Sequence, residues 1–288
     1  MSFNATNATD KTESPLPVLT IQATKSWGNL ALNEVWEYRD LLYFLLWREI
    51  KGRYKQMALG PLWIVLRPLF NMVLFTLIFG VVAKLPSDGV PYPIFTYTAL
   101  LPWTFFAGAV MGASNSLLAN RHLITKVYFP RLIVPIVSIL SGLVDFSISF
   151  IILLGMMLYY GYLPGWGILL LPLYMAVAAA TALTVGLWFA TWIVHYHDVG
   201  EIVSYLIRGW MYATPVVYAL SIIPEQWRVL YRLLNPMTDV IEGFRWALLG
   251  AGHSPDGITL LSVIWIIPLL ITGAFYFRRT ERTIVDIA

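Results

Sequence analysis

The 288-residue chain contains no cysteine, which excludes a disulfide framework, a thiol nucleophile and a cysteine-ligated metal site. Charge is also scarce, because Asp, Glu, Lys and Arg make up 12% of the residues against roughly a quarter in soluble domains. The sequence has no Gly-rich phosphate loop ending in Gly-Lys-Ser/Thr, no His-Glu-X-X-His motif and no Gly-X-Ser-X-Gly motif. Nothing in it therefore resembles an enzyme site.

What the chain has instead is long apolar runs. Phe146–Val194 holds 49 residues without an Asp, Glu, Lys, Arg or His. At about 1.5 Å per residue, a helix of that length crosses a hydrocarbon core of about 30 Å twice. The run breaks at Gly161–Gly167, where Gly and Pro favour a turn and Tyr and Trp residues suit the membrane interface. The protein is therefore expected to lie in a bilayer.

The apolar segments predict an all-α polytopic membrane protein with six spans. These spans are 61–83, 94–118, 132–159, 168–194, 202–221 and 257–277. They leave room for modest loops and no large second domain, so 34–288 is expected to form a single transmembrane domain. Residues 1–33 lack the apolar core of a signal peptide and are expected to form a flexible cytoplasmic tail.

Residues 34–57 predict an amphipathic helix on the membrane surface. Apolar residues recur every three or four positions along one face. The fully apolar piece, Leu41–Trp47, has seven residues, far fewer than the ~20 that a span needs. The basic residues of this interface helix are Arg48, Lys51, Arg53 and Lys55. We expect the helix to lie along the bilayer with its basic end toward anionic headgroups.

The distribution of positive charge predicts the orientation in the membrane. If both termini lie inside, 13 of the 19 Lys and Arg residues fall in the inner segments. Four fall in the outer segments, and three of these lie among acidic residues between 225 and 256. By the positive-inside rule, both termini are expected to be cytoplasmic.

The outer segment before the last span is not a plain loop. Residues 225–250 predict two short amphipathic helices separated at Asn235 and Pro236, since Asn suits an N-cap and Pro the first helical position. The pair suggests a re-entrant or interfacial cap on the outer side.

On the inner side, Asp198 and Glu201 match a capping box that starts a helix at the membrane surface. His195 and His197 are two residues apart and would lie on different faces of a helix. We therefore expect no metal site there.

Asp145 lies near the middle of the third span, where a carboxylate costs about 2.5–3.5 kcal/mol on insertion scales. It shares one helical stripe with Ser138, Ser141, Gly142 and Ser149, so this face is expected to meet other helices or a pore. Asp145 is either a hydrogen-bonded or ion-paired interior residue, or a pathway or proton-relay residue. The first reading is favoured because a relay normally needs several such groups.

Two arginines, Arg67 and Arg208, lie in the inner halves of the first and fifth spans. The simpler interpretation is that both side chains extend to the inner surface. The alternative is that they attract an anionic headgroup at a cytoplasmic entrance.

Four aromatic residues on the second and fourth spans are candidates for a sugar-contacting channel wall. They are Trp103, Phe106, Trp188 and Trp192. Aromatic faces stack on the apolar C–H patches of sugar rings, but packing or an interfacial belt is the commoner use of such residues.

The inner loop Leu118–Arg131 is short and basic, and a short helix there would protrude into the cytosol. It is either a positive-inside anchor or a docking site for a cytoplasmic motor.

Six motifs occur in order along the chain. They are Leu32–Leu42 (LNEVWEYRDLL), Arg48–Gln56 (REIKGRYKQ), Leu59–Trp63 (LGPLW), Leu101–Phe106 (LPWTFF), Lys126–Arg131 (KVYFPR) and Asn235–Met237 (NPM). In these motifs the chain resembles the permease subunits of type-2 ABC exporters, specifically their polysaccharide-export branch. The resemblance covers about residues 30–285, and its most specific parts are the basic run before the first span and the Asn-Pro-Met.

The resemblance implies a homodimer of six-span permeases bound to two cytoplasmic ATPases. The segment between spans two and three would be the coupling helix, with Asn120, Arg121, His122, Lys126, Tyr128, Phe129 and Pro130 at the ATPase contact. The interface helix would border the same contact, and Asp198 and Glu201 are expected to add a second one. An aromatic-lined channel at the permease pair would pass a lipid-linked glycan outward.

The main hypothesis is export of a lipid-linked polysaccharide, such as an O-antigen, capsule or teichoic-acid-like polymer, across the bacterial inner membrane. ATP and Mg are expected in the partner subunit, with no cofactor and no nucleic acid bound by this chain. One alternative is an ATP-driven exporter of lipids, drugs or other small amphiphiles. Another is a proton-coupled secondary transporter that uses Asp145.

Overall fold

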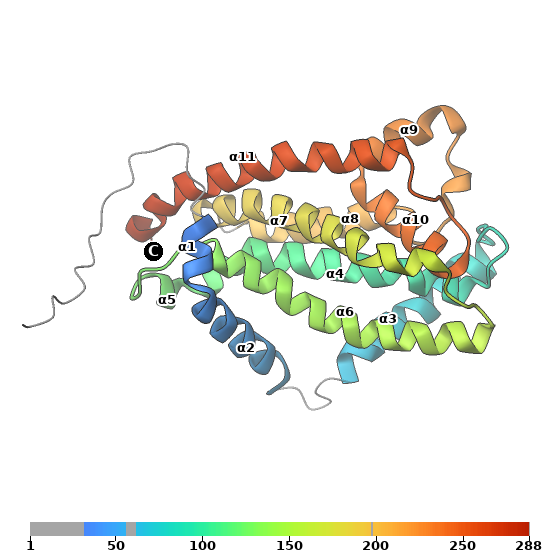
Figure 1. Cartoon of the computed structure of the whole chain (residues 1–288), viewed down its shortest axis with the longest axis horizontal. Coiled ribbons are helices and arrows are strands. Elements are labelled where there is room, and N and C mark those ends of the chain that lie inside the picture. Colours follow the sequence, from blue (N-terminus) through green and yellow to red (C-terminus); the bar gives the residue numbers. More distant parts are fainter. Residues whose placement is uncertain (1–31, 56–61, 197, 288) are drawn as a thin grey trace, which may run out of the picture.

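The computed structural model describes residues 32–55, 62–196 and 198–287, and these residues form helices, turns and loops without a strand (Figure 1). The helices are α1 (Leu32–Glu37), α2 (Arg39–Lys55), α3 (Leu62–Phe75), the π-helix η1 (Thr76–Val82), α4 (Tyr92–Ala119), α5 (Arg121–Ile124), α6 (Ile133–Tyr160), the 3-10 helix η2 (Trp166–Leu170), α7 (Leu171–His195), α8 (Val199–Tyr212), the 3-10 helix η3 (Leu220–Ile222), α9 (Glu225–Leu234), α10 (Pro236–Leu249) and α11 (Gly257–Ile287). The predicted all-α class is confirmed. The expected tail falls outside the described residues except for its last two positions, and His197 also falls outside them.

Five helical segments in the described ranges are long and apolar enough to cross a membrane. They are Leu62–Val82, Tyr92–Ala119, Ile133–Tyr160, Trp166–His195 and Gly257–Thr280. Each matches a predicted span, and their ends differ from the prediction by at most three residues. The predicted break in the 49-residue charge-free run is also present: α6 stops at Gly161, whose φ of 75° is the left-handed conformation that glycine adopts after a helix.

The predicted fifth span, 202–221, differs from the structure. The helix there, α8, has 14 residues and ends at Tyr212, so at 1.5 Å per residue it is about 21 Å long. It ends because Pro215 disfavours helical backbone at Thr214 and has no N–H to continue the ladder. Since α8 alone is shorter than a hydrocarbon core of about 30 Å, the count of six crossings stays a prediction.

Helix α4 is the centre of the molecule. It packs against α3, α6, α7, α8 and α10, and most of its side chains are buried. Small residues allow the closest approach: a Cβ at Gly186 of α7 would lie 2.5 Å from that of Ala113. The continuous segment of α3 and η1, Leu62–Val82, is the opposite case, because only 11% of its most apolar 18-residue window is buried. Much of its surface is therefore left for lipid or a partner.

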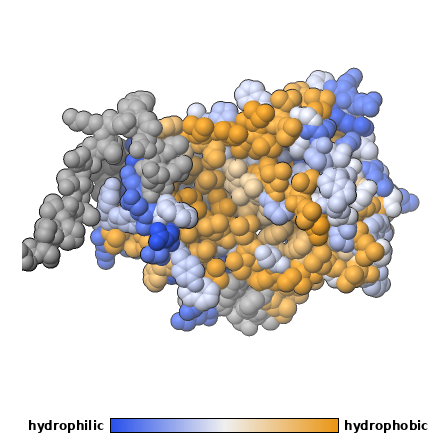
Figure 2. Space-filling model, viewed as in Figure 1, coloured by the Kyte–Doolittle hydropathy of each residue, from blue (hydrophilic) through white to orange (hydrophobic). Residues whose placement is uncertain are grey.

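The surface agrees with a membrane setting. Figure 2 shows hydrophobic residues over the middle of this face, with most of the hydrophilic residues toward the two ends. In Figure 1, α1, α5 and the C-terminal end of α11 lie at one end of the molecule, while α9 lies at the other. The two ends of the described chain are therefore on the same side.

The two predicted outer helices are present as α9 and α10. Helix α10 buries the apolar residues of its inner face, which are Met237, Val240, Ile241, Phe244 and Leu248. Helix α9 has the reverse arrangement: its apolar residues Trp227, Leu230 and Leu234 are exposed, and the charged Arg232 is buried. Charge pairing under α9 therefore outweighs burial of its apolar face.

Candidate functional site

The basic segment between α4 and α6 forms a raised, anchored surface. Its one-turn helix α5 exposes Arg121 and His122, and Lys126 and Tyr128 after it are exposed as well. Ile124 and Phe129 instead insert into a buried cluster with Leu45 of α2. Phe129 is therefore an anchor rather than a contact residue. Pro130 is half-buried beside it. The exposed set carries positive charge on a fixed base, which suits an acidic protein surface.

Helix α2 is joined to this segment by a side-chain hydrogen bond. The Arg48 guanidinium donates to Oδ1 of Asn120, whose amide group donates in turn to the carbonyl oxygen of Ser116 at 3.0 Å. Leu45 of α2 is buried in the same cluster as Phe129. Two of the predicted functional segments, the interface helix and the coupling segment, are thus one packed unit.

The prediction that the whole basic end of α2 faces lipid headgroups is wrong for Arg53. Its guanidinium points onto α6, where it donates to Asp145 at 3.0 Å, to Glu49 at 2.7 Å and to Ser141 at 2.7 Å. The Ser141 hydroxyl also donates to Glu49 at 2.9 Å. Lys51 and Lys55 remain exposed. Arg53 turns inward because the intramembrane carboxylate of Asp145 offers a stronger partner than water.

This cluster decides between the two interpretations of Asp145. The carboxylate is ion-paired with Arg53 and shares a hydrogen-bond network with Ser141, which lies on the polar stripe predicted from the sequence. The ion-paired, structural reading is therefore the one that the geometry supports.

Asp198 and Glu201 are both exposed at the start of α8. Asp198 holds the N-cap position, as predicted, but its side chain makes no capping hydrogen bond, so the predicted capping box does not form. Ser204 of α8 contacts the sulfur of Met111 at 3.8 Å, which places this helix start beside the second half of α4. The two carboxylates are free to meet a partner at that end of the molecule.

The aromatic residues predicted to line a channel on α4 lie in the core instead. Trp103 and Phe106 are 3% and 0% exposed, and their rings are 5.3 Å apart. Phe106 also meets Trp210 of α8 edge-on at 5.2 Å. Because both residues are enclosed by their own chain, packing, the commoner use of such aromatic residues, is the role that the structure supports for them.

Trp188 and Trp192 join α7 to α11. Trp188 stacks on Tyr276 with ring centroids 5.0 Å apart, and the Trp192 indole N–H donates to the Tyr276 hydroxyl at 3.3 Å. Trp192 keeps 42% of its surface exposed. Helix packing is therefore the role that their contacts support.

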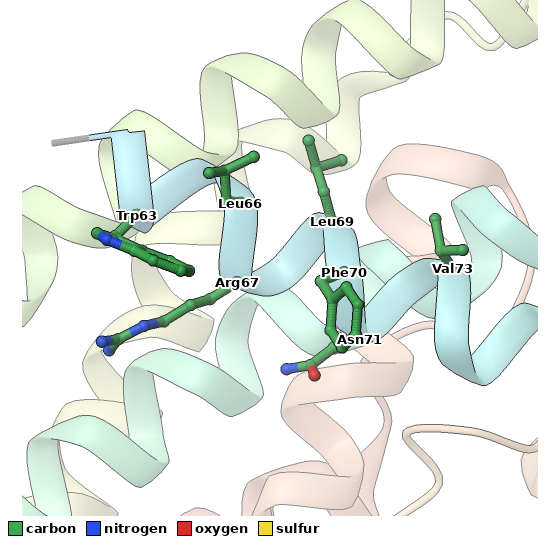
Figure 3. Close-up of a pocket in the computed structure, with 7 residues that line it drawn as sticks. All are labelled: Trp63, Leu66, Arg67, Leu69, Phe70, Asn71 and Val73. Atoms are coloured by element: carbon green, nitrogen blue, oxygen red, sulfur yellow. The ribbon is translucent and has the colours of Figure 1, made fainter. Parts of the chain in front are cut away.

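Arg67 and Arg208 are exposed, and each lies over an aromatic ring of its own helix. The Arg67 guanidinium is 5.8 Å from the centroid of Trp63, and that of Arg208 is 5.6 Å from Tyr205. Arg67 also lines a groove. This groove, of about 640 Å³, is formed along α3 by Trp63, Leu66, Arg67, Leu69, Phe70, Asn71 and Val73 (Figure 3).

A buried charge cluster at the opposite end was missed by sequence reasoning. Arg232 of α9 donates to Asp239 of α10 at 2.6 Å and grips Asp256 with two bonds of 2.8 and 2.7 Å. Ser262 of α11 donates to Asp239 at 2.9 Å, and Thr259 to Asp256 at 3.0 Å. The cluster ties the outer cap to the start of α11.

The electrostatics of the two carboxylates in this cluster differ. The hydrogen bonds from Arg232 hold the pKa of Asp256 well below its usual range. Burial raises the pKa of Asp239, against the lowering influence of Arg232 and Ser262. The sequence signal for the cluster was Arg and acidic residues on both sides of the Asn235-Pro236 break in a charge-poor chain.

A second buried pair lies within α10. Arg245 is 1% exposed and donates to Glu242 at 2.9 Å and to the carbonyl oxygens of Val216 and Tyr218. Its guanidinium also lies 3.6 Å over the ring of Phe95. Asn235 adds to this fixation, since it donates to Thr214 at 2.9 Å and accepts from the Trp210 indole at 3.1 Å. The segment that ends α8 is thereby held against the cap.

In the part of the chain that the structure describes, no group of three or more His, Cys, Asp or Glu side chains is placed to hold a metal ion. A family model described as ABC-2 type transporter matches residues 40–249, which cover the interface helix through α10. The chain belongs to the ABC-2 type transporter family.

Three individual proteins are similar to this chain over most of its length. It is 33% identical to the O-antigen export system permease protein RfbA of Myxococcus xanthus over 87% of this chain and 96% of that protein. It is 28% identical to the RfbA protein of Klebsiella pneumoniae over 86% and 95% of the two chains. Identity to the polysialic acid transport protein KpsM of Escherichia coli is 25% over 84% and 94%.

Membership in this family shows which type of membrane protein this chain is. The chain is a multi-pass membrane permease, and ATP is hydrolysed by a separate ATPase subunit. The predicted resemblance to type-2 ABC permeases is confirmed.

Proposed function

We propose that this chain is the permease subunit of an exporter that moves a lipid-linked polysaccharide across the bacterial inner membrane. The observation that carries the proposal is the similarity to the Myxococcus xanthus O-antigen permease along 96% of that protein. The similarity to the polysialic acid transport protein KpsM supports a glycan cargo as well.

The working unit in this proposal is a homodimer with two cytoplasmic ATPases, which bind the ATP and Mg. Both termini then face the cytoplasm, because α5 and the two ends of the described chain share one end of the molecule. The exposed apolar surfaces of η1 and α8 support pairing with a second copy; they include Val81 and Val82 on η1 and Leu206 and Tyr212 on α8.

The ATPase docks, in this proposal, on the exposed residues of the coupling segment, Arg121, His122, Lys126 and Tyr128, with Asp198 and Glu201 as a second contact. Movement of that segment is passed to α2 through Arg48 and Asn120 and the shared apolar cluster. Helix α2 then acts on the membrane helix α6 through Arg53 and Asp145. No ion pair along this path has to break, so the packed side chains can transmit a rigid displacement.

The geometry gives less support to proton-coupled transport. Its candidate proton site, Asp145, is ion-paired with Arg53. This carboxylate is engaged in joining α2 to α6, which is a structural role.

Deletion of the gene tests the proposal. We expect the polymer to accumulate inside the cell and to return to the surface when the chain is expressed again. The purified chain is expected to bring with it a Walker-type ATPase whose turnover rises with a lipid-linked saccharide. Surface polymer that persists unchanged after deletion would show that the assignment is wrong.

A further inference from the structure

Arg67 has no carboxylate beside it, unlike three other arginines of the described residues. Arg53, Arg232 and Arg245 each pair with an acidic side chain at 3.0 Å or less. No acidic side chain in the described ranges lies within 4.0 Å of Arg67, which is exposed on a largely apolar helix. Its positive charge is therefore available to a ligand.

The neighbours of Arg67 on α3 also carry hydrogen-bond donor groups. Trp63, Arg67 and Asn71 recur at intervals of four residues, so they form one row about 12 Å long on the helix surface. Their indole N–H, guanidinium and amide groups supply several donors, and the row contains no carboxylate. Figure 3 shows the Trp63 ring beside the Arg67 side chain, with Asn71 one turn further along.

The remaining wall of the groove is apolar. Leu66, Leu69 and Val73 project along the other side of α3 in Figure 3. A row of donors bordered by aliphatic side chains matches a ligand with a negatively charged headgroup on a hydrocarbon chain. Arginine is especially suited to phosphate, because its planar fork binds two phosphate oxygens at once.

We propose that this groove binds the phosphate-bearing linkage between lipid and glycan in the transported molecule. Arg67 grips the phosphate oxygens, Trp63 holds the guanidinium in place through its ring, and Asn71 donates a further hydrogen bond. The inference rests on the proposed function and adds a recognition site to it. It predicts that the permease distinguishes a lipid-linked saccharide by its phosphate as well as by its sugars.

The test uses the purified complex of the full chain with its ATPase, reconstituted in vesicles. Lipid-linked saccharide is titrated, and ATP hydrolysis is measured for wild type, Arg67→Gln and Arg67→Lys. Arg67→Gln is expected to raise the half-maximal saccharide concentration about tenfold, the effect of losing one charge-assisted contact. Arg67→Lys keeps the charge, so its half-maximal saccharide concentration is expected to lie between those of wild type and Arg67→Gln.

Arg208→Gln is the matched control, because it removes another exposed arginine–aromatic pair that lies outside the groove. It is expected to shift the half-maximal concentration less than about twofold. A phosphate-free form of the same lipid is added as a competitor. It should displace the lipid-linked saccharide from wild type no better than from Arg67→Gln. Equal shifts in Arg67→Gln and Arg208→Gln would overturn the site, since general attraction to the membrane would then explain both.

Two further outcomes are distinguishable. If Arg67→Gln separates the subunits on size-exclusion chromatography, a second copy of the chain occupies the groove and the phosphate assignment is wrong. If the wild-type complex does not respond to any lipid-linked saccharide, the proposed function itself fails and the phosphate site fails with it.

Discussion

Arg53 and Asp145 show how a single ion pair fixes the position of an interface helix. Arg53 lies between Glu49 and Asp145, so its removal leaves two carboxylates near each other on α2 and α6. We expect Arg53→Gln to lower the stability of the detergent-solubilised protein more than Asp145→Asn does. Because these side chains are about one-third exposed, the pair itself is worth only on the order of 1 kcal/mol. Thermal unfolding of both variants and the double variant gives the coupling energy.

A coupling energy of zero in that cycle would mean that the contact between α2 and α6 does not depend on the pair. Ser147→Ala, an exposed change on α6 outside the cluster, is a suitable control.

Gly243 is a residue-scale constraint on the packing of α10 against α7. A methyl group at this position would overlap the ring of Tyr174. We expect Gly243→Ala to destabilise the protein by about 1–3 kcal/mol, as overpacking in a dense core does. Gly155→Ala is the control, because an added Cβ there meets nothing within 4 Å. Thermal unfolding should show a lower midpoint for the first variant only, and Tyr174→Leu should partly restore it.

At the scale of elements, the outer cap is held to α11 by the Arg232 cluster. The pKa of Asp256 is held below its ordinary value of 3.8. A carboxyl with a lowered pKa contributes stability above its ordinary value and loses that contribution as the pH falls toward the folded value. We therefore expect wild type to be more stable than Asp256→Asn at pH 5–7, with the difference shrinking below about pH 4.

Unfolding midpoints of the two proteins across that range measure the effect. A difference that is constant with pH would contradict the role of the Asp256 charge. Glu225→Gln, which changes a nearby carboxylate whose side chain is 93% exposed, is the matched control.

Element positions were predictable where one local signal dominated. Long apolar runs located five helices, and Gly161 marked the end of α6, because hydrophobic length and glycine backbone freedom act without distant partners. The orientation of α9 was not predictable from its own pattern. Burial of Arg232 depends on Asp239 and Asp256, which lie 7 and 24 residues further along the chain.

The candidate site also contains residues whose exposure a local signal predicts and residues whose burial depends on distant partners. Exposure of Arg121 and Lys126 follows from their charge in a short loop. The burial of Trp103 and Phe106 could not be separated from a channel position by sequence, since both uses call for an aromatic residue on a span. Only the packing of Phe106 against Trp210 of α8 resolves it.

At the scale of the whole molecule, the coupling segment is predicted to hold the ATPase. The double change Arg121→Glu and Lys126→Glu reverses the charge of an exposed surface without touching its buried anchor Phe129. We expect the permease to remain folded but to lose at least about tenfold in ATPase recovered by co-purification. Lys84→Glu, an exposed charge reversal between η1 and α4, is the control and should retain the ATPase.

The number of crossings can be measured directly because the chain has no cysteine to interfere with labelling. Tyr128, Leu163 and Leu234 are all more than 70% exposed, so each accepts a single introduced cysteine. With six crossings, a membrane-impermeant maleimide labels Leu163→Cys and Leu234→Cys in intact cells, and Tyr128→Cys only after permeabilisation. If α8 does not complete a crossing, Leu234→Cys behaves like Tyr128→Cys instead. In the six-crossing outcome, α8 is only about 21 Å long, so the segment after Tyr212 must complete the crossing through the outer leaflet.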